Sequence, residues 1–123
     1  MTPVLFQNNE AGREAFTQLA SRAVQWIAEY YKNIDGYPVR SQVQPGDIYK
    51  QFPDQFPAVH VTDEEVFKIL QEVIIPGLTH WQHPDFDAFF PGNTSFPSIV
   101  AEMITAGISA QCILWESSPA AAE

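Results

Sequence analysis

Four side chains that can bind metals or transfer protons lie close together in the sequence: His80, His83, Asp85 and Asp87. Imidazole and carboxylate groups suit zinc or iron, and a pair of them can act as general acid and base in a hydrolysis. Pro84 lies between the histidines and the aspartates and keeps them from sharing a helix face. No serine or cysteine beside them is visibly activated as a nucleophile. We therefore predict loop residues with local hydrogen bonds and no metal site, with a metal-binding helical domain as an alternative.

These side chains belong to an aromatic loop, residues 80–97, with the sequence HWQHPDFDAFFPGNTSFP. Its prolines fix φ and remove backbone donors, so the loop cannot be one regular helix. Gly92 and Asn93 predict a turn. Rings at this density have to pack on the chain's own core or on another surface. They can equally line a pocket for an aromatic ligand, with Asn93, Thr94 and His83 as its polar groups. The rings that can do so are Trp81, Phe86, Phe89 and Phe90.

A long amphipathic helix is predicted over residues 9–34, because apolar side chains recur there at three- and four-residue steps. An asparagine at position 8 or 9 can cap its start, and Gly36 and Pro38 close its end. The apolar stripe consists of Phe16, Leu19, Ala23, Ile27, Tyr30 and Ile34. Residues 35–61 contain four prolines and are too irregular for a central strand. They form either an arm over another surface or a linker between helices, and the sequence favours the linker.

Two further helices follow from capping signals. Thr62 and Glu65 form a capping box that opens a helix over residues 63–75. Ser95, followed by an apolar run with a proline near its start, predicts a third helix that ends near Gly107. Each of these helices has an apolar face that needs a surface to cover.

The composition limits the class of protein. The 123 residues amount to one domain, and at 46% hydrophobic residues the chain can bury a core. The net charge of −9 argues against nucleic-acid backbones and anionic membranes as partners. No apolar stretch approaches the roughly 20 residues of a membrane span, and the first residues do not resemble a signal peptide, so we expect a soluble, cytoplasmic protein. The single cysteine, Cys112, excludes an intramolecular disulfide, and its apolar neighbours predict a buried thiol.

The predicted elements do not complete a core by themselves. No alternating pattern indicates a strand, so the predicted fold class is mainly α: three helices, a Pro-rich arm and the aromatic loop. Every helix has an apolar face, and two segments expose aromatic clusters. The chain is therefore interpreted as one part of a larger core.

The residues of the aromatic loop also carry a resemblance. The run IPGLTHWQHPDFDAFFPGNTSFP at 75–97, with Trp115 and the closing SSPAAAE, resembles the amino-terminal portion of the group II pyridoxal-phosphate-dependent decarboxylases. The aromatic-L-amino-acid and tyrosine decarboxylases are the most similar branch. The opening helix and the QPGD run at 44–47 fit the same pattern. Ala122 departs from it, since threonine is common there.

The resemblance implies a fold and a set of partners. This chain would be the amino-terminal segment of a fold type I enzyme, with residues 1–78 as a helical dimerisation segment. Residues 79–123 would hold the substrate-pocket loop and the start of the large cofactor domain. The partners would be the remainder of the decarboxylase, in the same or a separate polypeptide, assembled as a homodimer or heterotetramer.

The resemblance also implies a site. By position in the family pattern, Trp81, Phe89, Phe90, Pro91 and Gly92 would line the pocket for the substrate side chain. Gly92 replaces a residue that often carries a small side chain in the family. Ile113 would also line a substrate pocket, because it would approach the active site of the opposite subunit.

The implied chemistry is decarboxylation of an aromatic L-amino acid with pyridoxal 5′-phosphate, which would be bound mainly by residues outside this chain. The resemblance places the lysine that binds the cofactor further along the family's chain, and Lys32, Lys50 and Lys68 do not match its context. We therefore expect no decarboxylase activity from this chain alone. The alternative function is a non-catalytic module or partner subunit that binds a decarboxylase-like chain and regulates it.

Overall fold

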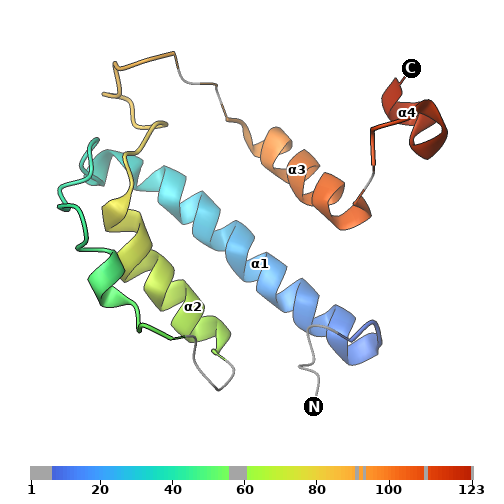
Figure 1. Ribbon diagram of the computed structural model, residues 1–123, viewed down its shortest axis with the longest axis horizontal. Helices are drawn as coiled ribbons and strands as arrows, with labels where there is room; N and C mark the ends of the chain where they lie inside the picture. Colours follow the sequence, from blue (N-terminus) through green and yellow to red (C-terminus); the bar gives the residue numbers. More distant parts are fainter. Residues whose placement is uncertain (1–6, 56–60, 91, 93, 110, 123) are drawn as a thin grey trace. The chain divides into compact units, whose positions relative to one another are not determined.

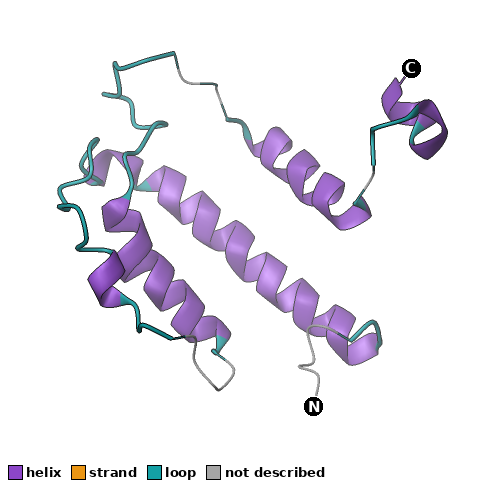
Figure 2. Ribbon diagram, viewed as in Figure 1, coloured by secondary structure: helices purple, strands orange, loops and turns teal. Residues whose placement is uncertain are grey.

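The computed structural model describes residues 7–55, 61–90, 92, 94–109 and 111–122 (Figure 1). Throughout these residues the backbone is helical or irregular, without a strand (Figure 2), which confirms the mainly α prediction. None of the helices in the described ranges is long and apolar enough to cross a membrane. The chain divides into two compact units, Met1–Asp87 (unit 1) and Ala88–Glu123 (unit 2). The predicted division after residue 78 stays a prediction.

The first predicted helix is α1, Glu10–Lys32. Its start is fixed by Asn9, whose Oδ1 accepts a hydrogen bond from the Gly12 N–H at 2.9 Å. It ends earlier than the predicted residue 34 because Asn33 leaves the helical conformation and its side-chain amide donates to the Glu29 carbonyl at 2.9 Å. The short 3₁₀ turn η2, Ile34–Gly36, then buries Ile34.

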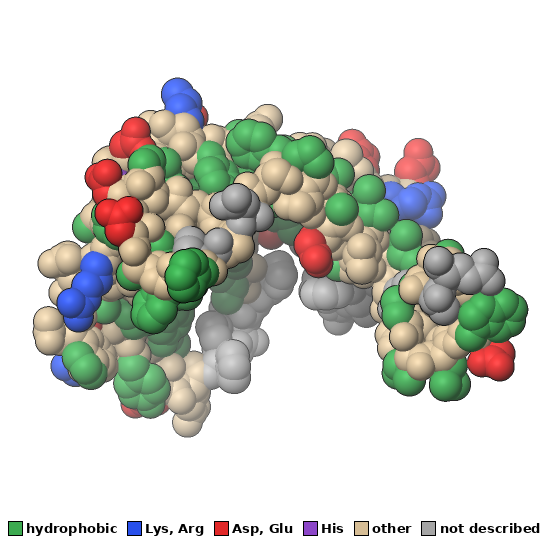
Figure 3. Space-filling model, turned by 90° about the horizontal axis from the view of Figure 1, so that it is seen from above, with side chains coloured by type: hydrophobic (Ala, Val, Ile, Leu, Met, Phe, Trp, Pro, Cys, Tyr) green, Lys and Arg blue, Asp and Glu red, His purple; other side chains and the backbone are tan. Residues whose placement is uncertain are grey.

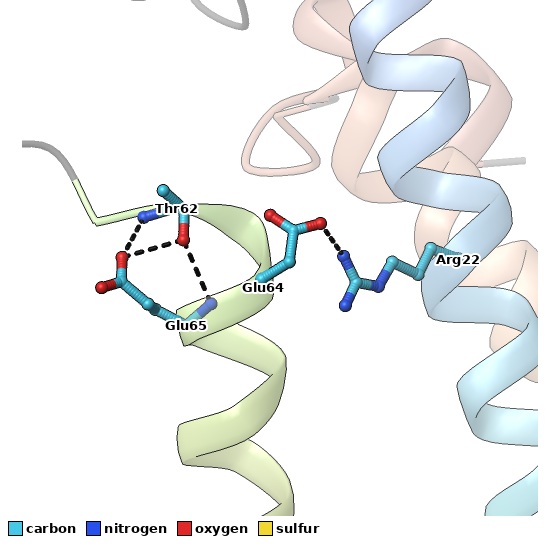
Figure 4. Close-up of polar contacts among 4 residues, drawn as sticks. All are labelled: Arg22, Thr62, Glu64 and Glu65. Atoms are coloured by element: carbon cyan, nitrogen blue, oxygen red, sulfur yellow. Dashed lines mark hydrogen bonds and ion pairs between the residues drawn. The ribbon is translucent and has the colours of Figure 1, made fainter.

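The second predicted helix changes character along its length. The capping box of Thr62 and Glu65 opens α2, Asp63–Ile69, as predicted (Figure 4). The backbone continues as a π-helical turn, η4 (Leu70–Ile74), and a 3₁₀ turn, η5 (Ile75–Gly77). In η4 the Ile75 N–H bonds to the Leu70 carbonyl, and Pro76 has no N–H with which to restore α-helical bonding.

Helices α1 and α2 lie side by side in unit 1 (Figure 1). An Arg22 guanidinium nitrogen lies 2.8 Å from Glu64 Oε1 (Figure 4), and the guanidinium carbon lies 4.4 Å from the centre of the Phe67 ring. One turn further along α1, Trp26 Nε1 donates to Gln71 Oε1 at 3.2 Å. An ion pair, a cation–π contact and a hydrogen bond therefore join α1 to α2 and the turn that follows it.

The Pro-rich segment connects α1 to α2, as the linker interpretation expects, and packs on unit 1 itself. It contains the 3₁₀ turn η3, Tyr49–Gln51. Ser41 Oγ donates to the Pro76 carbonyl at 2.9 Å. A Cβ atom on Gly77 would lie 2.9 Å from Ile48 Cδ1, so a larger residue at this position would require the Ile48 side chain to move.

Unit 2 is built on α3, Phe96–Ile108, whose start is fixed by a capping box of Ser95 and Ser98. The helix ends at Ile108, one residue beyond Gly107, and the following residue, Ser109, caps it in the left-handed conformation. The 3₁₀ turn η6, Trp115–Ser117, and the short helix α4, Pro119–Ala122, follow (Figure 1). Helix α4 was not predicted from the sequence. The prediction of a buried thiol was wrong: Cys112 is exposed, because it lies in irregular backbone between α3 and η6.

Candidate functional site

The first part of the aromatic loop folds as two successive turns in unit 1. The His83 N–H donates to the His80 carbonyl at 3.0 Å, and the Phe86 N–H donates to the His83 carbonyl at 3.0 Å. Pro84 cannot donate, so no regular helix forms through this point. The prediction that the loop is not one regular helix is confirmed.

The turns separate histidine from aromatic side chains. His80 is 2% exposed and His83 is 7% exposed, whereas Trp81 between them is 49% exposed. The Trp81 and Phe86 rings stack with their centres 5.1 Å apart and their planes inclined by 28°. The imidazoles are thus the anchors of this segment, and the stacked rings form an apolar surface.

The buried His80 lies among tyrosines. Its Nδ1 is 2.7 Å from the Tyr30 hydroxyl, and the Tyr37 ring lies 4.9 Å from the imidazole, centre to centre. Burial, with the nearby positive charge that His83 would carry, lowers the His80 pKa below its ordinary value. Burial also raises the pKa of Tyr30, with smaller contributions from Tyr31 and Tyr37. Both groups are therefore neutral near pH 7.

The metal alternative finds no support in this geometry. His83 Nδ1 accepts a hydrogen bond from the Asp85 backbone N–H at 3.0 Å, so its lone pair is already used. Among the described residues, no three His, Cys, Asp or Glu side chains are grouped so that they could hold a metal ion. His83 and Asp85 instead make the local hydrogen bond that the sequence favoured, whereas the His80 side chain bonds to the distant Tyr30.

A second group of predicted pocket residues lies in unit 2. Phe89 is 76% exposed and the Phe90 side chain is fully exposed at 103%. Phe89 has a φ of 61°, an unusual left-handed conformation for a bulky residue. A Cβ atom added to Gly92 would meet no other atom within 4 Å. Pro91 lies outside the described residues.

Ile113 also belongs to unit 2 and is 81% exposed. It follows the carboxyl end of α3, whereas Phe89, Phe90 and Gly92 precede its amino end. Thirteen helical residues span about 20 Å at 1.5 Å per residue. The unit thus presents two apolar segments at opposite ends of one helix.

The predicted site residues therefore fall into two sets: Trp81 in unit 1, and the others in unit 2. The side chains that the structure describes are exposed and apolar. They can form walls against an apolar ligand, but they cannot transfer a proton. Sequence reasoning missed Tyr30 and Tyr37 as partners of His80, because contacts across 50 and 43 positions leave no local pattern.

The lysines of this chain do not fit the role of a cofactor-binding lysine. Each lies on the surface beside an acidic residue within one helical turn: Lys32 with Glu29 at 3.3 Å, Lys50 with Asp47 at 3.8 Å and Lys68 with Glu72 at 4.0 Å. Their side chains are 71%, 75% and 68% exposed. An amine that forms a Schiff base is activated by desolvation or a neighbouring cation, whereas these three amines are exposed and lie beside carboxylates.

The sequence is similar to a known family and to several of its members. The sequence model of the pyridoxal-dependent decarboxylase conserved domain matches residues 45–123. The chain is 38% identical over 128 aligned positions to an aromatic-L-amino-acid decarboxylase of Catharanthus roseus, covering 99% of this chain and 26% of that protein. It is 42% identical over 110 positions to a phenylacetaldehyde synthase of Petunia hybrida, covering 89% of this chain and 22% of that protein.

A solved structure is similar along nearly the whole chain. The crystal structure of Catharanthus roseus tryptophan decarboxylase in complex with L-tryptophan superposes with a TM-score of 0.85 at 40% identity. The match covers 94% of this chain and 24% of that one. This chain thus spans about a quarter of the length of the relatives that it matches.

Proposed function

Because the chain belongs to the pyridoxal-dependent decarboxylase family, we propose that it is the amino-terminal part of an enzyme that decarboxylates aromatic L-amino acids. The complete enzyme would release CO2 and form the corresponding amine. The similarity to a tryptophan decarboxylase over 94% of this chain is the observation that carries the proposal. The exposed aromatic side chains of both units are consistent with it, because they offer surfaces that an aromatic substrate and the rest of the enzyme can cover.

The proposed role of the aromatic loop is to form walls of the substrate pocket. Trp81, Phe89, Phe90 and Pro91 would line the pocket for the substrate side chain, and Gly92 would offer only its backbone to the substrate. Apolar walls also exclude water from the substrate carboxylate, which disfavours its charged ground state before CO2 leaves. These side chains would bind the substrate and exclude water from it, and none of them is proposed to transfer a proton.

Ile113 is proposed to serve the pocket of a partner subunit. It lies beyond the opposite end of α3 from Phe90, and the helix between them is about 20 Å long. A homodimer would let each chain contribute Phe90 to one pocket and Ile113 to the other. The exposed apolar face of α3 offers a surface for such an assembly. Its members are Phe96, Val100, Met103, Ile104 and Ile108.

Pyridoxal phosphate is the family's cofactor, and when bound its ring supplies an electron sink for the carbanion left by departing CO2. The three exposed, acid-paired lysines of this chain do not fit its attachment. We therefore propose that the remainder of the enzyme holds the cofactor, and that this chain shapes the space for the substrate.

The test uses the complete enzyme with L-tyrosine and L-tryptophan as probes. We expect cofactor absorbance, release of CO2 and formation of an amine. Phe90→Ala is expected to raise KM about tenfold or more while the cofactor stays bound, because a ring that covers the substrate is worth about 1.5–3 kcal/mol. Phe52→Ala, in the linker, is the matched control and is expected to leave KM unchanged. Unchanged kinetics for Phe90→Ala would contradict the pocket role, and absence of CO2 release would contradict the proposed activity.

Aldehyde synthesis is a second candidate, because the phenylacetaldehyde synthase of Petunia hybrida is as similar as the decarboxylases. Identification of the organic product as an amine or an aldehyde decides between them. A third possibility is a non-catalytic module that regulates a decarboxylase. Copurification with an intact decarboxylase would favour that role, whereas copurification with a truncated lysine-bearing chain would favour a split enzyme.

A further inference from the structure

His80, the residue before Trp81, is held at three points. Its backbone N–H donates to the Val39 carbonyl at 2.9 Å, and its own carbonyl accepts from the His83 N–H at 3.0 Å. Its side-chain Nδ1 makes the third contact, with the Tyr30 hydroxyl at 2.7 Å. These ties join the carboxyl end of α1, the linker and the aromatic loop. The backbone that leads into Trp81 is therefore fixed from three directions.

The third contact is the only one of the three that is made by side chains, so it depends on which residues stand at positions 30 and 80. A phenol is a stronger acid than a neutral imidazole, so the Tyr30 hydroxyl donates and Nδ1 accepts. Among the described residues, no buried side-chain nitrogen or oxygen lacks a hydrogen-bond partner. Loss of the hydroxyl would leave the 2% exposed imidazole with an unsatisfied acceptor, which is costly at a buried position. The hydrogen bond thus sets the orientation of His80.

The rings around His80 offer an internal comparison. Tyr37 packs closer to the imidazole than Tyr30 does, at 4.9 Å against 5.6 Å between ring centres. The Tyr37 hydroxyl, however, accepts from Gln71 Nε2 at 3.5 Å, whereas the Tyr30 hydroxyl bonds to His80. Removal of the Tyr30 hydroxyl would therefore break the hydrogen bond to His80, whereas removal of the Tyr37 hydroxyl would leave that bond intact. Both changes keep the rings that pack on the imidazole.

We propose that Tyr30 and His80 are positioning residues, whose hydroxyl–imidazole hydrogen bond sets the Trp81 ring as a wall of the substrate pocket. This inference rests on the proposed function for the pocket, but the placement of Trp81 can be measured without activity. Trp81 stacks on Phe86, so a shift of the His80 backbone would move two aromatic surfaces together. The histidine acts through its neighbour and does not touch the substrate.

The central experiment compares Tyr30→Phe with Tyr37→Phe in the complete, cofactor-loaded enzyme. Tryptophan is replaced by 5-fluorotryptophan, and the Trp81 resonance in the fluorine NMR spectrum is identified by its loss in Trp81→Phe. We expect this resonance to shift or broaden in Tyr30→Phe and to stay in place in Tyr37→Phe. With L-tryptophan as substrate, we expect KM to rise about five- to tenfold in Tyr30→Phe, with a smaller change in kcat and unchanged cofactor absorbance.

A second pair of variants tests His80 itself. His80→Asn keeps an acceptor near the position of Nδ1, and His80→Leu removes it. We expect His80→Asn to retain a Trp81 resonance and a KM closer to those of the unsubstituted enzyme. Equal effects of the two substitutions would contradict the role of the hydrogen bond.

The possible results are distinguishable. An unmoved Trp81 resonance in Tyr30→Phe overturns the positioning role. A moved resonance with unchanged KM, in an enzyme that is otherwise active, overturns the link to the pocket. An enzyme without bound cofactor or CO2 release overturns the proposed function, and the Trp81 resonance then still decides whether Tyr30 positions this ring.

Discussion

The two units of the chain differ in how they hold their side chains. In unit 1, hydrogen bonds and ring contacts join residues far apart in sequence, such as Tyr30 to His80 and Arg22 to Glu64. In unit 2, Ile99 and Ser118 are the described side chains that are not classed as exposed. Its caps are local, such as Ser95 with Ser98. Unit 1 therefore supplies part of its own packing, whereas unit 2 mainly offers surface.

The described residues leave much apolar surface exposed and bury little of it. Figure 3 shows hydrophobic side chains at the surface. The exposed large hydrophobic residues include five from α3: Phe96, Val100, Met103, Ile104 and Ile108. Only Ile34 and Ile75 are buried hydrophobic residues among those described. A chain of this size would normally bury a far larger apolar core, and we therefore expect other protein to supply the remaining packing. Four predictions test the contrast between the units.

The largest expected effect is on assembly. Ile104→Asp puts a charge on the exposed apolar face of α3, and if that face is buried in the complete enzyme, the charge costs several kcal/mol. We expect association to weaken by at least about a hundredfold, measured by analytical ultracentrifugation. Thr105→Asp, on the side of the helix that carries Glu102, is the control and should assemble normally. Normal assembly of Ile104→Asp would show that unit 2 does not use this face.

The second prediction concerns the small core of unit 1. Ile75→Ala removes a side chain that is 4% exposed and should lower the free energy of unfolding by about 2–4 kcal/mol. The matched change in unit 2, Ile108→Ala at 69% exposure, should cost below about 0.5 kcal/mol in the isolated chain. Urea unfolding followed by helical circular dichroism measures both. Equal losses would erase the distinction between the units.

The third prediction concerns pH. Burial lowers the His80 pKa below 6.5, with His83 contributing in the same direction. Above pH 6.5 the group is neutral in both the folded and unfolded chains. As the pH falls below 6.5, the unfolded chain takes up a proton first, so stability is lost until the pH passes the folded pKa. His80→Asn should lack this loss in urea unfolding between pH 7 and 5.

A carboxylate provides the control for that pH range. The pKa of Glu29 is lowered from 4.5 by the hydrogen bond from Asn33 and by Lys32. Its contribution is therefore lost only below pH 4.5 and does not overlap the His80 range. Identical pH profiles for the unsubstituted chain and His80→Asn would contradict the account of His80.

The smallest expected effect is at the junction of α1 and α2. Arg22 is partly exposed, and its ion pair with Glu64 is screened by water. Its guanidinium also lies over the Phe67 ring, a contact worth about 0.5–1 kcal/mol at an exposed site. Arg22→Ala should therefore destabilise unit 1 slightly more than Glu64→Gln in thermal unfolding. A larger loss from Glu64→Gln would mean that the ion pair dominates.

Local sequence signals predicted the helices well. The capping box at Thr62 and Glu65 and the cap at Ser95 place two helix starts, and the resemblance over residues 75–97 is confirmed by the family match. The helix end at Lys32 and the π-helical turn at Leu70–Ile74 were not predicted, because both depend on competing backbone hydrogen bonds. Such alternatives differ too little in energy to be read from periodicity.

The candidate site was less predictable for a physical reason. The Tyr30–His80 contact joins residues that are 50 positions apart. In the sequence, Tyr30 was interpreted as part of the apolar stripe of a helix and His80 as a possible metal ligand. The two residues come together in the folded unit 1, far apart in the sequence. The exposure of Cys112 was mispredicted because an apolar sequence context indicates burial somewhere, without saying against which surface.

Whether unit 2 depends on protein outside this chain can be measured by hydrogen–deuterium exchange of α3. The exchange would be compared between the 123-residue chain alone and the complete enzyme. We predict fast exchange of the α3 amides in the isolated chain and at least about a hundredfold slower exchange in the complete enzyme. Equal protection of α3 in both samples would contradict the account.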